Sequence, residues 1–177
     1  MLFDDLRRIA PSAVAIGDFD GVHIGHAAIM HTLAAEAAKR GLSSAAITFD
    51  INTKHSRVLL CGSAKAELLI KHGAMHVLTL DFAAIKNVDA AIFAASLAAS
   101  GVKCLVCGEG FRFGKDALGD IHTLYSVGID PVVVPPVTVD GSPVSSTRIR
   151  QALEANDTEL AVRLLGREIR NDEGWTK

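Results

Sequence analysis

Two histidines in the segment at residues 17–26 have the types and spacing of a phosphate-binding site. His23 and His26 lie three positions apart, where a glycine-containing loop leads into a helical pattern. The free amides and positive dipole end of a helix N-terminus attract phosphate, and imidazole N–H groups would add directed hydrogen bonds. Gly25 would let a ligand approach the backbone closely. The segment therefore predicts a phosphate site; the alternative is that both histidines only cap or pack the helix.

A hydroxyl-rich segment at residues 145–150 is the second candidate. Ser145, Ser146 and Thr147 suit the start of a helix, where their hydroxyls would lie beside free backbone amides. Arg148 adds a planar, charged donor fork. Together these residues predict further phosphate contacts, although they could equally form an N-cap followed by a solvated face. A third, glycine-rich segment spans residues 108–114.

The scaffold for these segments is predicted by an alternation of short apolar runs with longer helical patterns. The expected strands are residues 13–17, 45–49, 76–80, 102–107 and 131–135. The expected helices are residues 25–40, 64–72 and 88–100, each closely followed by a glycine suited to a C-terminal cap. Apolar strands separated by helices predict a three-layer, Rossmann-like α/β fold with a parallel sheet of about five strands. Ligands of such sheets bind beyond the carboxyl ends of the strands, where the three segments are expected.

The C-terminal part of the chain has a different pattern. A turn is predicted at residues 140–141, followed by a helix that begins at the serines and reaches about Leu153. A last helix is expected, with Asn156 and Glu159 as a capping box and Gly166 as its stop. The 177 residues contain no repeat or interdomain linker, so one domain is expected.

Composition and charge argue against several classes of protein. The 18 basic and 20 acidic residues nearly cancel, which argues against nucleic acid as the main partner. No apolar stretch approaches the roughly 20 residues that cross a bilayer, and the charged N-terminus is unlike an export signal. A cytoplasmic protein without membrane contact is expected, and its oligomeric state stays open.

The three cysteines are expected to be structural. Cys104 and Cys107 have the spacing of a redox motif, but they fall in a predicted strand. Residues three apart on a strand point to opposite faces, so these thiols should not share a metal or a bond. With Cys61 they do not form a disulfide framework.

The motifs resemble those of a known enzyme family. Residues 17–26 resemble the Gly-x-Phe-Asp-Gly-Val-His-x-Gly-His signature of bacterial FAD synthetases, usually the N-terminal half of bifunctional riboflavin kinase/FAD synthetases. These enzymes belong to the His-x-Gly-His nucleotidyltransferase superfamily. Residues 106–114 are similar to the family's Val-x-Gly-x-x-Phe-x-Phe-Gly segment, residues 144–150 to its second nucleotide-binding motif, and residues 164–167 to its closing segment.

The resemblance implies that FMN attacks the α-phosphorus of ATP, giving FAD and pyrophosphate, with Mg²⁺ carried by the phosphates. The implied catalytic residues are His23, His26 and Arg148. The implied nucleotide-binding residues are Gly17, Asp18, Phe19, Gly21, Gly25, Gly108, Gly110, Ser145, Ser146, Thr147 and Arg150. The implied flavin-binding residues are Thr48, Asp50, Asn52, Phe111 and Phe113. No residue is assigned as a direct metal ligand.

The chain departs from the family pattern in three places. No riboflavin kinase domain follows Arg167, so the chain is not expected to make its own FMN. The strand end at Thr48, Phe49 and Asp50 continues without the family's Pro-x-Pro segment, which predicts a looser or re-aimed loop. Gly110 stands where the family commonly has Asn or Asp before the Phe-x-Phe-Gly element.

These departures leave other functions open. One is a nucleotidyltransferase that acts on another phosphorylated acceptor; another is a protein that binds ATP or FMN without turnover. Asp18 and Asp20 also resemble the Asp-x-Asp-Gly loop of haloacid-dehalogenase-type phosphatases. That mechanism needs an acidic pair at a later strand end, and the fourth predicted strand is followed by glycines instead.

Overall fold

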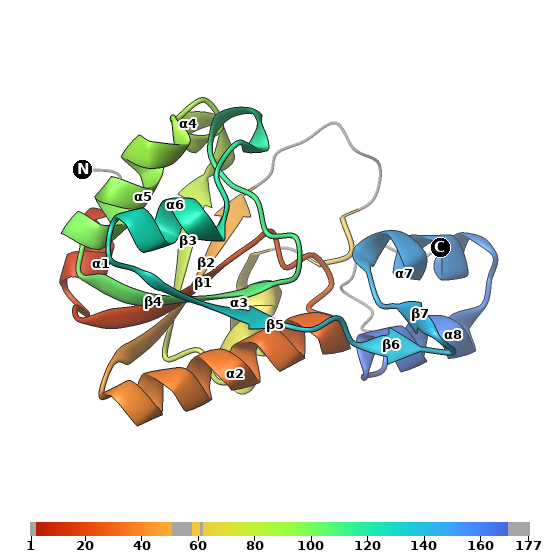
Figure 1. The fold of residues 1–177 in the computed structure, drawn as a ribbon. Helices are drawn as coiled ribbons and strands as arrows, with labels where there is room; N and C mark the ends of the chain where they lie inside the picture. Colours follow the sequence, from red (N-terminus) through yellow and green to blue (C-terminus); the bar gives the residue numbers. More distant parts are fainter. Residues whose placement is uncertain (1–2, 51–57, 61, 170–177) are drawn as a thin grey trace.

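A parallel five-stranded sheet forms the centre of the molecule. The computed structural model describes residues 3–50, 58–60 and 62–169. The strands lie in the order β3-β2-β1-β4-β5 (Figure 1). Their bounds are β1 Ser12–Ile16, β2 Ser43–Asp50, β3 His76–Asp81, β4 Val102–Gly108 and β5 Asp130–Val134. Each predicted strand is present with ends within about two residues of the expected ones, which is the usual margin for such assignments.

Helices cover both faces of this sheet. One face carries α2 Ile24–Arg40 and α3 Gly62–Lys71. The other carries α1 Asp4–Arg7, α4 Phe82–Ile85, α5 Ala90–Ala99 and α6 Ile121–Ser126. Successive strand residues enter different cores: Ala13 packs with Met30 of α2, whereas Val14 belongs to the cluster that contains Phe93 of α5. This alternation confirms the predicted three-layer α/β fold.

The sequence pattern missed the short helices. Helices α1, α4 and α6 have four to six residues, and a 3₁₀ turn spans Lys115–Ala117. Such segments are too short to display a helical period. Their start signals are single side chains: Asp81 accepts from the Ala83 amide, and Asp120 accepts from the amides of His122 and Thr123. In the part of the chain described, no helix has the length and apolar character needed to cross a bilayer.

The two cysteines of β4 lie on opposite faces of the sheet, as predicted. Cys104 belongs to the core beneath α2, and Cys107 belongs to the core beneath α5. Both are buried and free, and burial raises the pKa of the Cys107 thiol to about 11. The structural assignment of these two residues is therefore confirmed, while Cys61 lies outside the described residues.

The C-terminal part of the chain leaves the sheet and packs at one side of it (Figure 1). It consists of the hairpin β6 Thr138–Val139 and β7 Ser142–Pro143, then α7 Ser146–Glu154 and α8 Thr158–Leu165. The predicted turn closes the hairpin, with positive φ at Asp140 and Gly141. Ile149 of α7 and Leu164 of α8 form a third buried cluster, which also takes in Leu59 from the segment before α3.

The N-cap of α8 is Asp157, so the predicted capping box at Asn156 was wrong. The Asp157 carboxylate accepts from the Leu160 amide at 3.0 Å. Asn156 has a φ of 59°, a left-handed conformation that asparagine tolerates better than most residues. Its backbone forms part of the turn after α7. Gly166 ends α8 in a left-handed C-cap, as predicted.

Candidate functional site

The loop between β1 and α2 places the two histidines of the first motif in direct contact. His23 is the N-cap of α2, and its Nδ1 accepts from the His26 amide at 3.3 Å. The two imidazole rings stack with centroids 3.6 Å apart and planes inclined by 16°. Phe19 and Gly21 have positive φ in this loop, and the Phe19 ring meets His26 edge-on. Packing therefore fixes both rings before any ligand binds.

Both imidazoles are neutral at neutral pH. Burial lowers the pKa of His23 to about 4. Burial also lowers the pKa of His26 well below its usual value, with smaller contributions from His23 and Lys65. The Nδ1 atom of His26 is buried and has no hydrogen-bond partner among the described residues. Buried polar atoms are normally paired, so this nitrogen is an exception that packing alone does not explain.

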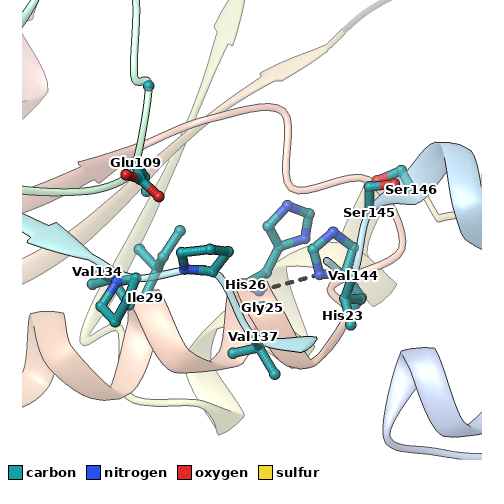
Figure 2. Close-up of a pocket in the computed structure, with 14 residues that line it drawn as sticks. His23, Gly25, His26, Ile29, Glu109, Val134, Val137, Val144, Ser145 and Ser146 are labelled. Atoms are coloured by element: carbon teal, nitrogen blue, oxygen red, sulfur yellow. Dashed lines mark hydrogen bonds between the residues drawn. The ribbon is translucent and has the colours of Figure 1, made fainter. Parts of the chain in front are cut away.

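A cavity of about 500 Å³ opens beside the histidines. We call it the nucleotide cavity, and it is lined by His23, Gly25, His26, Ile29, Gly108, Glu109, Gly110, Val134, Pro135, Pro136, Val137, Val144, Ser145 and Ser146. Figure 2 shows the imidazole rings beside Ser145 and Ser146, with Glu109 farther from them along the cavity. One end thus offers imidazoles and hydroxyls, and the other offers apolar side chains and one carboxylate.

The serines of the second motif hold the start of α7 against the histidine loop. The Ser145 Oγ accepts from the Arg148 amide at 3.2 Å, which makes Ser145 the N-cap. The Ser146 Oγ donates to the carbonyl of Asp20 at 2.8 Å. Thr147 is exposed. The two segments are over a hundred residues apart in sequence, and this contact brings their polar groups to one cavity.

The arginines of the second motif have other contacts. The Arg148 Nη1 donates to the carbonyls of Val139 and Ser142, both at 2.9 Å, so this guanidinium faces the β6–β7 hairpin. Arg150 forms an ion pair with the buried Asp20 carboxylate. Asp20 also accepts from two amides of the segment before α3, at Leu59 and Leu60. Arg148 is therefore not among the residues that line the nucleotide cavity.

A second cavity, of about 620 Å³, is lined in part by the start of the same loop. We call it the aromatic cavity, and its walls include Gly17, Asp18, Phe49, Phe82, Phe93, Phe111 and Phe113. The rings of Phe111 and Phe113 are stacked with centroids 5.6 Å apart. Of the predicted flavin residues, these two line the cavity. Thr48 is buried behind it and donates to the Asp18 carbonyl at 2.9 Å, Asp50 is the last residue of β2, and Asn52 lies outside the described residues.

Sequence reasoning missed several residues around the two cavities. Phe49 and Phe82 were not singled out because an aromatic residue in an apolar run usually belongs to a core. Their position could have indicated a binding site, because both lie at carboxyl ends of parallel strands, where ligands of such sheets bind. Glu109 was passed over inside the glycine-rich segment. Lys65 was not singled out within its predicted helix, yet it is buried beside Asp18.

Comparisons with known proteins agree with these features. A model of the FAD synthetase family matches residues 6–148. A bifunctional riboflavin kinase/FMN adenylyltransferase from Pseudomonas fluorescens is 34% identical over 168 residues, covering 88% of this chain and 54% of that protein. A putative enzyme of the same name from Geobacillus thermodenitrificans is 33% identical, covering 88% of this chain and 89% of that protein.

The similarity extends to a solved structure. A crystal structure described as a macrolide-efflux protein from Streptococcus pneumoniae superposes with a TM-score of 0.80 and 28% identity. The match covers 90% of this chain and 56% of that one. This chain spans about half the length of that structure and of the P. fluorescens relative.

Proposed function

Because the chain belongs to the FAD synthetase family, we propose that it transfers the adenylyl group of ATP to FMN and releases FAD and pyrophosphate. One observation carries this proposal: the nucleotide cavity and the aromatic cavity share the loop after β1. The nucleotide cavity, with imidazoles and hydroxyls at one end and apolar side chains at the other, suits a nucleoside triphosphate, and the aromatic cavity suits a flat ring system. Two substrates bound in this way would meet at the loop.

In this account the triphosphate lies against His23, His26 and the start of α7. Neutral imidazoles and the Ser145 hydroxyl would donate hydrogen bonds to phosphate oxygens without requiring a charge change. Both histidines line the nucleotide cavity, and the buried Nδ1 of His26 has no partner among the described residues. The nucleoside then extends toward Ile29 and Val134, where the cavity wall is apolar.

The flavin ring would enter the aromatic cavity between Phe49, Phe82 and the stacked pair Phe111 and Phe113. Stacking between aromatic faces provides both affinity and orientation. With the ring held there, the phosphate of FMN is directed toward the loop at Gly17 and Asp18. This arrangement places the nucleophile next to the end of the nucleotide cavity that holds the histidines.

The reaction needs alignment more than proton transfer. An oxygen of the FMN phosphate attacks the α-phosphorus of ATP, and the bond from that phosphorus to the oxygen bridging to the β-phosphate breaks. The nucleophile is already an anion, and pyrophosphate leaves as one, so no general base is required. Fixed donors such as His26 would stabilise charge on the α-phosphate and the leaving group. Arg148 would join them only after releasing the carbonyls of the hairpin.

Magnesium would enter as part of the ATP chelate. The described residues contain no group of three or more His, Cys, Asp or Glu side chains placed to hold a metal ion. The phosphate end of the nucleotide cavity offers imidazoles and hydroxyls, with which a hydrated ion on the phosphates is compatible. Mg²⁺ usually keeps several waters and binds through substrate phosphates, which it neutralises.

The proposal is tested by the products formed from ATP and a set of phosphorylated acceptors with Mg²⁺. We expect FAD by mass spectrometry and pyrophosphate release that requires both ATP and FMN. Riboflavin, which lacks the attacking phosphate, is the matched control and should give no dinucleotide. Adenylylation of another phosphorylated acceptor in the absence of FAD would contradict the assignment of FMN. Tight binding of ATP and FMN without any product would contradict the assignment of catalysis.

A further inference from the structure

Lys65 is a buried cation at the junction of the two cavities, and none of the motifs includes it. It lies on α3, and its side chain is 8% exposed. Its Nζ donates to the Asp18 carbonyl at 2.9 Å and to the Phe49 carbonyl at 3.3 Å. The Asp18 carboxylate lies 3.5 Å away. The ammonium thus joins the end of β2 to the loop that carries the histidines.

The burial of this ammonium needs an explanation beyond packing. Removing a charge from water costs several kcal/mol unless it is closely paired. Within the described residues the ion pair formed by Lys65 is a long one, with a carboxylate that is itself 46% exposed. A neutral donor could hold the two carbonyls at a lower desolvation cost. A positive charge at this point therefore indicates a role in the site.

The contacts of Asp18 show how Lys65 can affect both cavities without lining either of them. The Asp18 carbonyl accepts from Lys65 and also from the Thr48 hydroxyl, so its peptide group is held from two elements. The Asp18 residue lines the aromatic cavity. The next residue, Phe19, has a φ of 52° and presents its ring to His26. Movement of Asp18 would therefore disturb both the acceptor site and the catalytic imidazole.

The pKa shifts of Asp18 and His26 support the same connection between Lys65 and the histidine loop. Burial raises the pKa of Asp18, and the adjacent Asp20 adds to the rise, whereas Lys65 and Arg150 oppose it. The charge of Lys65 also helps to lower the pKa of His26. The aromatic cavity has other charged groups, Lys86, Arg112 and Asp116, but they lie in segments other than the histidine loop.

We propose that Lys65 is a positioning residue: its ammonium, acting through Asp18, fixes the loop between the two cavities and so aligns the acceptor phosphate with the α-phosphate of ATP. This inference rests on the proposed function. Lys65 does not line either cavity and need not touch a substrate. Its loss should reduce the rate of transfer while leaving ATP binding nearly intact.

The test compares Lys65→Met, Lys65→Arg and, as a matched control, Lys71→Met at an exposed lysine of the same helix. A small misplacement of reacting groups can cost about 10²-fold in rate, and we expect a loss approaching this in kcat for Lys65→Met. The KM for ATP should stay within about twofold, since the nucleotide cavity keeps its own donors. Lys65→Arg, which keeps the charge and the donors, should recover much of the rate. Lys71→Met should match the wild type.

Asp18→Asn is a second variant, which tests the same contact if Lys65→Met does not fold. It keeps the carbonyl contact but removes the carboxylate, so a smaller loss in kcat is expected. The double variant should be no slower than Lys65→Met alone, because both changes affect one contact. Wild-type kcat in folded Lys65→Met, or no recovery in folded Lys65→Arg, would overturn the inference. Absence of FAD from the wild type would instead count against the proposed function.

Discussion

His26 is the single residue on which the proposed chemistry depends most. Its ring is fixed by stacking on His23 and by the edge of Phe19, and its buried Nδ1 has no partner among the described residues. We expect His26→Ala to lower kcat by about 10²–10³, the usual loss for one preorganised donor. His31→Ala, at an exposed histidine of the same helix, is the control and should keep full activity. Comparable turnover in both variants, at equal thermal stability, would remove His26 from the mechanism.

Substitution of Gly110 tests one departure from the family pattern, the glycine that replaces the usual Asn or Asp. Its φ is 75°, and a Cβ built on it meets no atom within 4 Å, so space is open but the backbone favours glycine or asparagine. Gly110→Asn should therefore fold, and an added hydrogen bond of roughly 0.5–1.5 kcal/mol would raise kcat/KM about two- to tenfold. Gly110→Ala adds the Cβ without the amide and separates strain from bonding. Lower FAD formation by Gly110→Asn than by Gly110→Ala would show that a polar side chain is harmful there.

At the scale of elements, Asp20 joins three parts of the chain. Its carboxylate accepts from the Leu59 and Leu60 amides and pairs with Arg150, and its carbonyl accepts from Ser146. Asp20→Ala removes the acceptor of the buried Leu59 and Leu60 amides and the ion pair with Arg150, while the backbone contact with Ser146 remains. We therefore expect the free energy of unfolding to fall by about 3–5 kcal/mol. Hydrogen exchange should show the largest loss of protection in α7 and α8.

The exposed pair of Asp140 and Arg163 is the control for that loss, because it also links two elements of the C-terminal part. Asp140→Ala removes an ion pair whose side chains are about half exposed, so the expected change is below about 1 kcal/mol. Equal destabilisation by the two substitutions would mean that Asp20 does not hold α7 against the histidine loop.

The elements also show which features of this fold can be predicted from sequence. Strand β1 was predictable because both of its faces are buried, which favours an apolar run, and in β4 only the exposed Lys103 interrupts such a run. The histidine loop was predictable because its residue types are rare in that combination. The inward position of Lys65 was not, because a lone lysine in a helical pattern is normally solvated. Nor was the direction of Arg148, which depends on hairpin carbonyls that only the folded chain brings near.

At the scale of the whole molecule, the buried histidines make stability depend on pH. The pKa of His23 is about 4 in the folded chain and about 6.5 when unfolded, so the unfolded chain binds more protons between these values. The free energy of unfolding should therefore fall as the pH drops from about 6.5 toward 4, by roughly 3 kcal/mol for His23. His26 acts in the same direction.

His23→Asn isolates this contribution, since asparagine can still cap α2 but does not titrate. Urea unfolding at several pH values should give a shallower decline for the variant than for the wild type between pH 4 and 6.5. An unchanged slope would show that His23 is not the neutral, buried group described here.

Transfer of the α-phosphorus is the central claim, and labelled ATP tests it most directly. ATP labelled at the α-phosphorus is incubated with FMN, Mg²⁺ and the protein, and a parallel reaction uses ATP labelled at the γ-phosphorus. We predict that the α-label appears in FAD and the γ-label in pyrophosphate, in equal amounts. Label in orthophosphate, or an α-label that never reaches a flavin, would contradict the account.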